Sequence, residues 1–582
     1  MRPLIFVLCV VTMFSCNKPE NSSSLSSENS DVKLNTKIDS ELKKHKPDTF
    51  KLNLQSNSFV YGYTDQLSVD VMVEVYDTEK KQIGFFDGPA RGPEYFQFKT
   101  DKPGIYKLVI SPFQENEGKY SLLLTNAEPL ATEPEKQIDQ LVDASLHLSD
   151  GKIAPGVSIG VMKDGKMVYS KGFGYADIES EEKVTSKTIF HVASVSKQFT
   201  AFSIALLVDQ GKLSLKDDIR KYLPEIHDFG KTITIDHLIH HTSGLRDQWN
   251  LLAMAGWRLD DVITKKQILR LISKQRELNF NPGDESVYCN TGYTLLAEIV
   301  SRVSGKSFAD WTKENIFDPL EMKNTLFYDD HEKIVMGRAY SYQASNVGYK
   351  KSVLSYANAG ATSLFTTPED LSLWALNFEK MKVGNPNVMA MMDQRFILTK
   401  GDTISYAFAQ DIGKYKSLNI RVHSGGDAGF RSFLLRFPDQ HFSVAVFSNY
   451  ANFDPGSLSY TIADMYLKDQ LKEEKPKPDQ PAPTPEGKKI VFDASKVKLG
   501  EYVGTFYSPE LETAYTFAVE NDTLRAHHQR HDDSKFSPIR PDVFQANQWF
   551  LGEVEFVRNK ANQITGFRAS NGRVRGVKFE KK

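Results

Sequence analysis

The sequence predicts a multidomain protein in which a central α/β (α+β) domain is flanked by an N-terminal β-sandwich and a C-terminal small β-barrel-like domain. Three observations predict this arrangement. The 582 residues exceed what one hydrophobic core usually supports. Apolar residues alternate with polar ones in both flanks, whereas the middle mixes helical and strand periods. A Pro-rich stretch separates the middle from the tail.

The composition indicates a folded protein without a nucleic-acid partner. Hydrophobic residues make up 40% and charged residues 25%, which is ordinary for a folded soluble chain. The 72 basic and 74 acidic side chains leave a formal net charge of -2. This near-balance argues against a broad positive surface of the kind that binds nucleic acid.

Residues 1–16 have the pattern of a lipoprotein signal peptide. Arg2 is followed by the apolar run Leu4–Met13, which is too short to span a bilayer. The run ends at Ser15-Cys16, which resembles a bacterial lipobox although Met13-Phe14 departs from its usual residues. We therefore expect a lipid anchor on Cys16, a membrane contact through that lipid, and attachment in the bacterial cell envelope, periplasmic or at the outer membrane. The alternatives are a plain cleaved signal peptide and an uncleaved anchor.

The three cysteines of the chain leave no pair for a disulfide. Cys9 would leave with the signal peptide and Cys16 would carry lipid, so Cys289 alone remains in the folded body. A metal site built on cysteines is excluded by the same count.

The flanking segments differ in composition. Residues 17–46 are rich in Ser, Asn, Lys and Glu, which predicts a flexible tether. Residues 47–127 show period-two alternation, clearest from Val69 to Val75, and predict the β-sandwich. This segment is similar to the pre-peptidase type of secreted accessory domain, which implies binding or stabilisation.

The middle and the tail are divided by proline. Residues 135–470 hold a predicted hairpin around Lys163-Asp164-Gly165 and a predicted buried helix from Lys197 to Gln210 that Gly211 ends. Residues 471–489 form a Pro-rich linker, which we interpret as a solvated spacer. Residues 490–582 alternate in short runs and predict the C-terminal β domain.

One serine stands out as a candidate nucleophile. The spacing Ser-x-x-Lys recurs along the chain, at Ser40, Ser149, Ser180, Ser194 and Ser495. Ser194 alone lies between an extended segment and a strongly apolar helix. Residues three apart on a helix share a face, so Lys197 is expected beside the Ser194 hydroxyl. Unpaired N–H groups at that helix end favour an anion. The alternative is a helix cap with a surface lysine.

A serine nucleophile needs a base, and two residues are candidates for handling its proton. Lys197 serves if burial lowers its pKa. A second hydroxyl in a Tyr-x-Asn motif would relay the proton, and this motif recurs at Tyr288, Tyr356 and Tyr450. Tyr288 alone follows a Pro-Gly loop and precedes an apolar helix. The alternative makes Tyr288 a core aromatic and Asn290 a helix cap.

The third candidate element is His423-Ser424-Gly425-Gly426, between two predicted strands. Small residues there let the backbone approach a ligand closely. The Gly426 N–H opposite the Ser194 N–H would complete an oxyanion hole. The alternative is an ordinary turn.

Together, Ser-x-x-Lys, Tyr-x-Asn and His-x-Gly resemble, in order and in frame, the penicillin-recognising serine hydrolases, specifically the group related to class C β-lactamases. The segments 173–177, 240–245 and 366–371 join the resemblance, which covers about 135–470. It implies a β-lactamase-like serine hydrolase domain in which Ser194 forms an acyl-enzyme, Lys197 and Tyr288 manage its proton, and Asn290 orients the substrate. Relatives include D-aminopeptidases, DD-carboxypeptidases and esterases.

The resemblance also assigns His423, Gly425 and Gly426 to substrate binding. His423 occupies the place where many members carry a lysine that grips the substrate carboxylate. Histidine is largely neutral near pH 7, which argues against strong β-lactamase activity and leaves peptidase, amidase and esterase activity open.

The function expected from these residues is hydrolysis of a small peptide, amide or ester, most of all a D-amino-acid peptide. A tail β domain is similar to the one that restricts access in some D-aminopeptidase-like members, which favours peptides. The alternatives are a carboxylesterase, a weak β-lactamase and, from another class, a catalytically silent scaffold that binds cell-envelope material. The sequence does not indicate the oligomeric state.

No cofactor and no metal are expected. His240 and His241 are adjacent, so their side chains diverge and lack a third ligand; a structural hydrogen bond near the Ser243-Gly244 turn is expected instead. Asp427 and Arg431 are expected to pair with each other, with substrate contact as the alternative.

Overall fold

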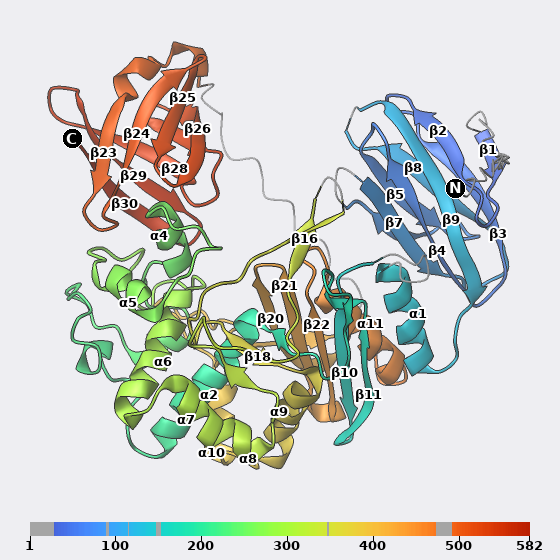
Figure 1. Ribbon diagram of the computed structural model, residues 1–582, viewed down its shortest axis with the longest axis horizontal. Helices are drawn as coiled ribbons and strands as arrows, with labels where there is room; N and C mark the ends of the chain where they lie inside the picture. The colour runs from blue at the N-terminus through green and yellow to red at the C-terminus, as the bar shows by residue number, and fades with distance from the viewer. Residues whose placement is uncertain (1–27, 89–91, 115, 147–152, 346–347, 473–491) are drawn as a thin grey trace, which may run out of the picture. The chain divides into compact units, whose positions relative to one another are not determined.

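The computed structural model describes residues 28–88, 92–114, 116–146, 153–345, 348–472 and 492–582 (Figure 1). The expected signal peptide with Cys16, and all but the first two residues of the expected linker 471–489, lie outside these ranges. Contacts divide the chain into two compact units, Met1–Ser145 and Leu146–Lys582. No helix in the described ranges is long and apolar enough to cross a membrane.

The first unit is a β-sandwich, as predicted. One sheet has the order β1-β3-β8-β5-β6 and the other β2-β9-β4-β7. Both sheets contribute to one core, in which Leu52 and Leu108 meet Val60 and Leu122. The strands are β1 (Glu28–Asp31), β2 (Ile38–Leu42), β3 (Asp48–Leu54), β4 (Ser58–Gln66), β5 (Val71–Tyr76), β6 (Gln82–Phe86), β7 (Gly92–Lys99), β8 (Gly104–Pro112) and β9 (Gly118–Pro129), before helix α1 (Pro134–Leu146).

The expectation of a flexible tether over 17–46 is wrong for its second half. Strand β1 pairs with β3, and strand β2 pairs with β9 from Ile38 to Leu42. Ile38 and Leu42 are buried in the sandwich core, so two apolar side chains at strand ends fix an otherwise polar segment.

The second unit is built around a six-stranded antiparallel sheet with the order β11-β10-β22-β21-β20-β19. Its strands are β10 (Val157–Lys163), β11 (Lys166–Phe173), β19 (Asp411–Tyr415), β20 (Leu418–Asp427), β21 (Phe430–Phe437) and β22 (Phe442–Ser448). The predicted hairpin joins β10 to β11. Helix α9 (Pro368–Lys380) packs on the sheet at Gly160, and helix α11 (Pro455–Leu467) packs on it at Phe433. Because cross-strand partners share a face, the register from β10 through β22 to β21 places Gly160 and Phe433 on opposite faces. The two helices therefore cover opposite faces of the sheet.

A helical layer carries the segment that holds Ser194. Helix α2 (Ser196–Asp209) is almost entirely buried, packs on α6 (Asn290–Ser304), and is followed by Gly211 at φ +68°, as predicted. The other helices are α3 (Ile235–Ile239), α4 (Gln248–Met254), α5 (Lys265–Ser273), α7 (Phe308–Thr312), α8 (Asp318–Leu320) and α10 (Pro386–Met392). Short strands complete the domain: β12 (Tyr175–Asp177), β13 (Glu182–Lys183), β14 (Phe190–His191), β15 (Leu326–Phe327), β16 (Tyr342–Ala344), β17 (Tyr349–Lys351) and β18 (Leu364–Thr366).

The tail folds into a closed eight-stranded barrel, which confirms the predicted β domain. Its strands are β23 (Gly504–Ser508), β24 (Thr513–Glu520), β25 (Thr523–His528), β26 (His531–Arg540), β27 (Val543–Ala546), β28 (Glu553–Arg558), β29 (Ile564–Asn571) and β30 (Val574–Lys581). Inward-facing phenylalanines fill it, with Phe506, Phe517, Phe556 and Phe567 in mutual ring contact.

Candidate active site

Ser194 lies in a tight turn immediately before helix α2. The turn is the 3-10 segment η2 (Ala193–Val195), and Ala193 has a φ of 45°, a left-handed conformation that costs free energy for a residue other than glycine. The hydroxyl of Ser196 donates to the carbonyl of Ala193 and accepts from the N–H of Leu364, so strand β18 holds the turn in place. The strain is thus stored directly beside the candidate nucleophile.

Lys197 is fully buried beneath Ser194. Its Nζ lies 3.1 Å from Ser194 Oγ, 2.9 Å from Asn290 Oδ1 and 2.6 Å from the carbonyl oxygen of Ala361. The amide and carbonyl oxygens only accept hydrogen bonds, so they take two N–H groups of the lysine. A neutral amine then has its lone pair free for the third partner, the Ser194 hydroxyl.

Asp247 fixes the orientation of Asn290. Asp247 Oδ2 accepts from both the backbone N–H and the Nδ2 group of Asn290, at 2.7 and 2.8 Å. Because Nδ2 is committed to this carboxylate, Oδ1 must face Lys197. Both ends of the Asn290 amide are therefore engaged within the protein, and its predicted role towards the substrate stays a prediction.

Burial sets the charge of Lys197. Removal from water is the largest influence and lowers the pKa of Lys197 to about 7. The carboxylates of Asp247 and Asp427 oppose this shift, whereas the guanidinium of Arg573 adds to it. A substantial fraction of the lysine is thus neutral near pH 7 and able to accept a proton.

Tyr288 stands beside the same pair. Lys197 Nζ lies 4.9 Å from the centroid of its ring, and the His241 ring contacts it at 4.3 Å between centroids, tilted by 38°. Burial raises the pKa of Tyr288 above its ordinary value, against smaller lowering influences from the Ser194 hydroxyl and Arg573. Tyr288 is therefore a neutral phenol at pH 7, able to pass a proton but not to act as a resting base.

The two adjacent histidines have separate structural roles. His241 Nδ1 accepts from the N–H of Cys289, which anchors the residue next to Tyr288. His240 Nε2 lies 3.0 Å from the carbonyl oxygen of Gln394. Both histidines thus form structural hydrogen bonds, with Cys289 and Gln394 as partners rather than Ser243 or Gly244.

His423 is a buried, neutral side chain on strand β20. Its Nδ1 lies 2.7 Å from the carbonyl oxygen of Ser424 and must donate, so Nε2 accepts from the Tyr406 hydroxyl at 3.1 Å. Burial, with Lys197 nearby, lowers the pKa of His423 to about 3. This strand passes close to η2: a Cβ on Gly425 would lie 2.4 Å from the Val192 carbonyl oxygen and 3.1 Å from Ser194 N.

The expected pair of Asp427 with Arg431 does not form. Asp427 instead accepts from the hydroxyls of Tyr356 and Thr362 and contacts His191 Nε2 at 3.1 Å. The Arg431 guanidinium donates to the backbone carbonyls of Ala428 and Phe430. Asp427 thus binds three residues from other segments in place of Arg431, its neighbour four positions along the chain.

These residues surround one cavity of about 710 Å³. Ser194, Tyr288, Asn290, His423 and Gly426 line it, while Lys197 and Gly425 lie directly behind the lining. All seven predicted site residues of the central domain are thus brought together. Sequence reasoning missed four further contributors: Asp247, the Ala361 carbonyl, Tyr406 and the barrel residue Arg573.

The hydroxyl of Ser194 contacts a buried lysine of lowered pKa, at the start of a helix and beside an antiparallel sheet. This arrangement defines a serine hydrolase site. The family model "Beta-lactamase" matches residues 138–465, more than half of the chain, and the chain belongs to this family.

Two relatives illustrate the likeness in sequence. The chain is 28% identical over 334 residues to "Protein flp" of Staphylococcus aureus, covering 55% of this chain and 64% of that one. It is 25% identical over 296 residues to a "D-aminopeptidase" of Gluconobacter oxydans, covering 51% and 56%. The chain thus spans less than two thirds of the length of either relative.

A solved structure shares the fold. The octameric penicillin-binding protein homologue from Pyrococcus abyssi superposes with a TM-score of 0.50 at 22% identity, covering 77% of this chain and 99% of that one. At this identity the likeness concerns the fold alone.

Proposed function

We propose that this protein hydrolyses peptide or amide bonds of D-amino-acid compounds through an acyl-enzyme on Ser194. The observation that carries the proposal is the 3.1 Å contact between Ser194 Oγ and the buried amine of Lys197. The likeness to a D-aminopeptidase supports the choice of substrate. With the expected anchor on Cys16, this activity would belong to the cell envelope.

The proposed reaction follows from the donors and acceptors present. Neutral Lys197 accepts the Ser194 proton as Oγ attacks the substrate carbonyl, and the N–H groups of Ser194 and Gly426 stabilise the resulting oxyanion. The proton passes from Lys197 through the Tyr288 hydroxyl to the leaving nitrogen, and the C–N bond breaks. Water, deprotonated by the same residues, then attacks the ester and releases the acid and free Ser194.

The test is covalent labelling with a fluorescent alkyl phosphonate, followed by mass spectrometry of the labelled peptide. We expect the label on Ser194 and none in Ser194→Ala. Ser180→Ala is a matched control, because Ser180 has the same spacing to a lysine but is exposed on a turn. A label on another serine, or none at all, contradicts the proposal.

A substrate panel then assigns the class. We expect a D-alanyl anilide to be turned over with a higher kcat/KM than its L-isomer and than a cephalosporin. An ester cleaved without any anilide cleavage contradicts the amide proposal and favours an esterase.

A further inference from the structure

The barrel contributes a charged residue to the cavity that holds Ser194. The turn between β29 and β30 carries Arg573, which lines the cavity together with Ser194, Tyr288 and the barrel residue Trp549. The guanidinium carbon of Arg573 lies 5.0 Å from the centroid of the Tyr288 ring. Lys197 contacts the same ring, and the scissile bond of a substrate must lie beside Ser194 and Lys197. The Arg573 guanidinium is therefore close to the place of that bond.

The turn is fastened to the catalytic domain through its backbone. The carbonyl oxygen of Arg573 accepts from Asn279 Nδ2 at 2.9 Å, and the N–H of Arg575 donates to Asn279 Oδ1 at 2.8 Å. Asn571 Oδ1 accepts from the N–H of Arg573 and from Asn250 Nδ2.

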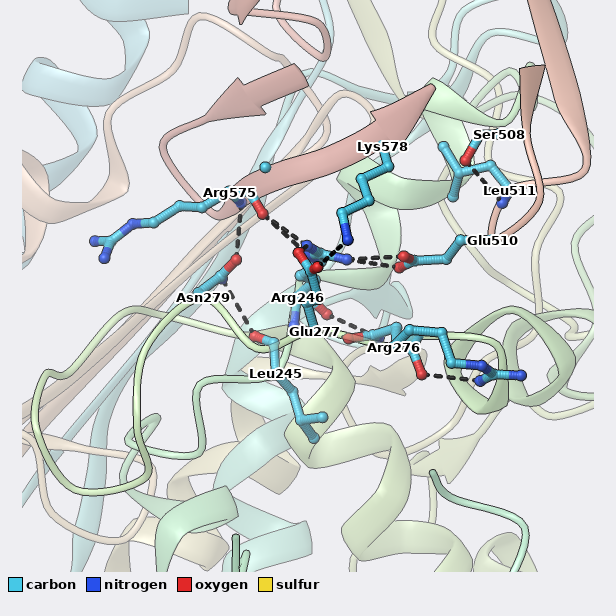
Figure 2. A network of polar contacts seen from close by, with 12 residues as sticks. Leu245, Arg246, Arg276, Glu277, Asn279, Ser508, Glu510, Leu511, Arg575 and Lys578 are labelled. Atoms are coloured by element: carbon cyan, nitrogen blue, oxygen red, sulfur yellow. Dashed lines mark hydrogen bonds and ion pairs between the residues drawn. The ribbon is translucent and has the colours of Figure 1, made fainter. Parts of the chain in front are cut away.

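A second set of contacts holds the carbonyl of Arg575. It accepts from two nitrogens of Arg246, at 3.1 and 2.9 Å, and the same arginine is paired with Glu510 (Figure 2). These contacts fix the position of the turn, so the guanidinium two residues earlier is presented from a rigid base.

The guanidinium of Arg573 contacts the Tyr288 ring but is not neutralised by a carboxylate of the described residues. Within the described parts of the chain, its guanidinium has no hydrogen bond or ion pair. The cavity's other arginine, Arg431, is committed to two backbone carbonyls, and His423 is neutral. The two acidic residues that line the cavity bind other partners than Arg573. Asp411 accepts a hydrogen bond from Ser405, and Asp427 contacts the three residues named above.

We propose that Arg573 forms an anion-binding subsite of this cavity and selects substrates with a carboxylate near the scissile bond. The planar guanidinium offers two parallel N–H donors, the geometry that a carboxylate accepts in bidentate fashion. This subsite rests on the hydrolase function proposed above and narrows its substrate class to compounds that carry a carboxylate on either side of the scissile bond.

The test compares substrates that differ in one charge. N-acetyl-D-alanyl esters of 3-hydroxybenzoate and of 3-hydroxybenzamide place the charge on the leaving group, and phenyl esters of succinyl- and succinamoyl-D-alanine place it on the acyl side. We expect the parent to prefer the anionic member of one pair by about tenfold or more in kcat/KM, the effect of one charged hydrogen bond. Arg573→Gln should bring that ratio to about one, and Arg573→Lys should restore part of it.

Arg575→Gln is the matched control, because Arg575 leaves the same turn but pairs with Glu285 at 2.9 Å, and it should keep the ratio of the parent. A ratio near one in the parent, a preference that survives Arg573→Gln, or a preference lost in Arg431→Gln instead, overturns the subsite alone. A chain that hydrolyses none of the four esters and takes no phosphonate on Ser194 overturns the proposed hydrolase itself.

Discussion

The three partners of the Lys197 amine differ in chemistry, and this difference assigns its function. Two are oxygens that accept only, and the third is a hydroxyl that also donates. A charged ammonium would satisfy all three as a donor, but burial disfavours that form. Near pH 7, Lys197 is therefore divided between its protonated form and the neutral form that accepts the proton of Ser194.

The pH dependence of activity follows from this balance. Lys197 acts as a base only when neutral, so kcat/KM on an uncharged D-alanyl ester should rise with pH through a midpoint of about 7 and level off above it. Below the midpoint the slope should be about tenfold per pH unit. The measurement is a pH–rate profile between pH 5 and 9.

A variant checks the origin of that midpoint. Arg573 lowers the pKa of Lys197, so Arg573→Gln should move the midpoint to higher pH. A profile that falls with pH across this range, or that moves the other way in the variant, would contradict Lys197 as the base.

The helix period predicted the contact between Ser194 and Lys197, whereas Tyr288, Asn290 and His423 were predicted from recurring motifs and from the family resemblance. Ser194 and Lys197 are one helical turn apart, so the helix period alone places them side by side. Asp247 and the Ala361 carbonyl reach Lys197 or its neighbour from distant segments, and their partners are set by the tertiary fold. Asp427 shows the same limit, since a sequence neighbour was expected where three distant residues bind it.

Strand β20 brings the glycines of the predicted substrate-binding motif against the nucleophile turn. The gap left by Gly425 is filled by the Val192 carbonyl, the Ser194 N–H and the Ser432 hydroxyl. A methyl group there must displace the strand from η2, because Ser194 lies in η2, Ser432 lies in strand β21, and the Ser432 hydroxyl donates to the Val192 carbonyl. Gly425 thus sets the width of the predicted oxyanion hole.

Gly425→Ala should lower kcat by about a hundredfold, the effect of losing one oxyanion donor. Steady-state kinetics with a D-alanyl ester and a thermal melt measure the two consequences. Gly413→Ala is the control, since a Cβ at Gly413 in the neighbouring strand β19 would meet only Ile420 at 3.8 Å. Parent-like kcat in Gly425→Ala would show that strand and turn are not tightly coupled.

The elements themselves were predictable where their pattern repeats. The alternating valines of β5 and the apolar run of α2 are long enough to carry a clear period. Strands β1 and β2 were missed because they are short and mostly polar, and β2 has buried residues only at its two ends. Pairing with β9, far along the chain, makes β2 a strand.

At the scale of the whole molecule, Arg246 joins the barrel to the catalytic domain. Its side chain is 1% exposed and lies 2.8 Å from Glu510, whose side chain is 12% exposed. Figure 2 shows Glu277 and Lys578 completing this charged network. Removal of one member of a buried ion pair leaves the other uncompensated.

Arg246→Ala should reduce the free energy of unfolding by about 3 kcal/mol or more, measured by urea titration of the full chain. The variant should also lose the preference for anionic esters, because Arg246 holds the carbonyl of Arg575. Arg270→Ala is the control: its pair with Glu512 is exposed, at 68% and 47%, and should change stability by less than about 1 kcal/mol. Equal losses in both variants would show that burial does not distinguish the two pairs.

The position of Arg573 on the barrel also bears on the order of synthesis. A ribosome delivers residues 194–288 well before the turn at 572–573, and the barrel closes only when β30 pairs with β23. A nascent chain therefore holds the nucleophile and its base before the residue proposed to choose the substrate. The proposed selectivity therefore depends on a part of the chain that is synthesised after the residues of the nucleophile and its base.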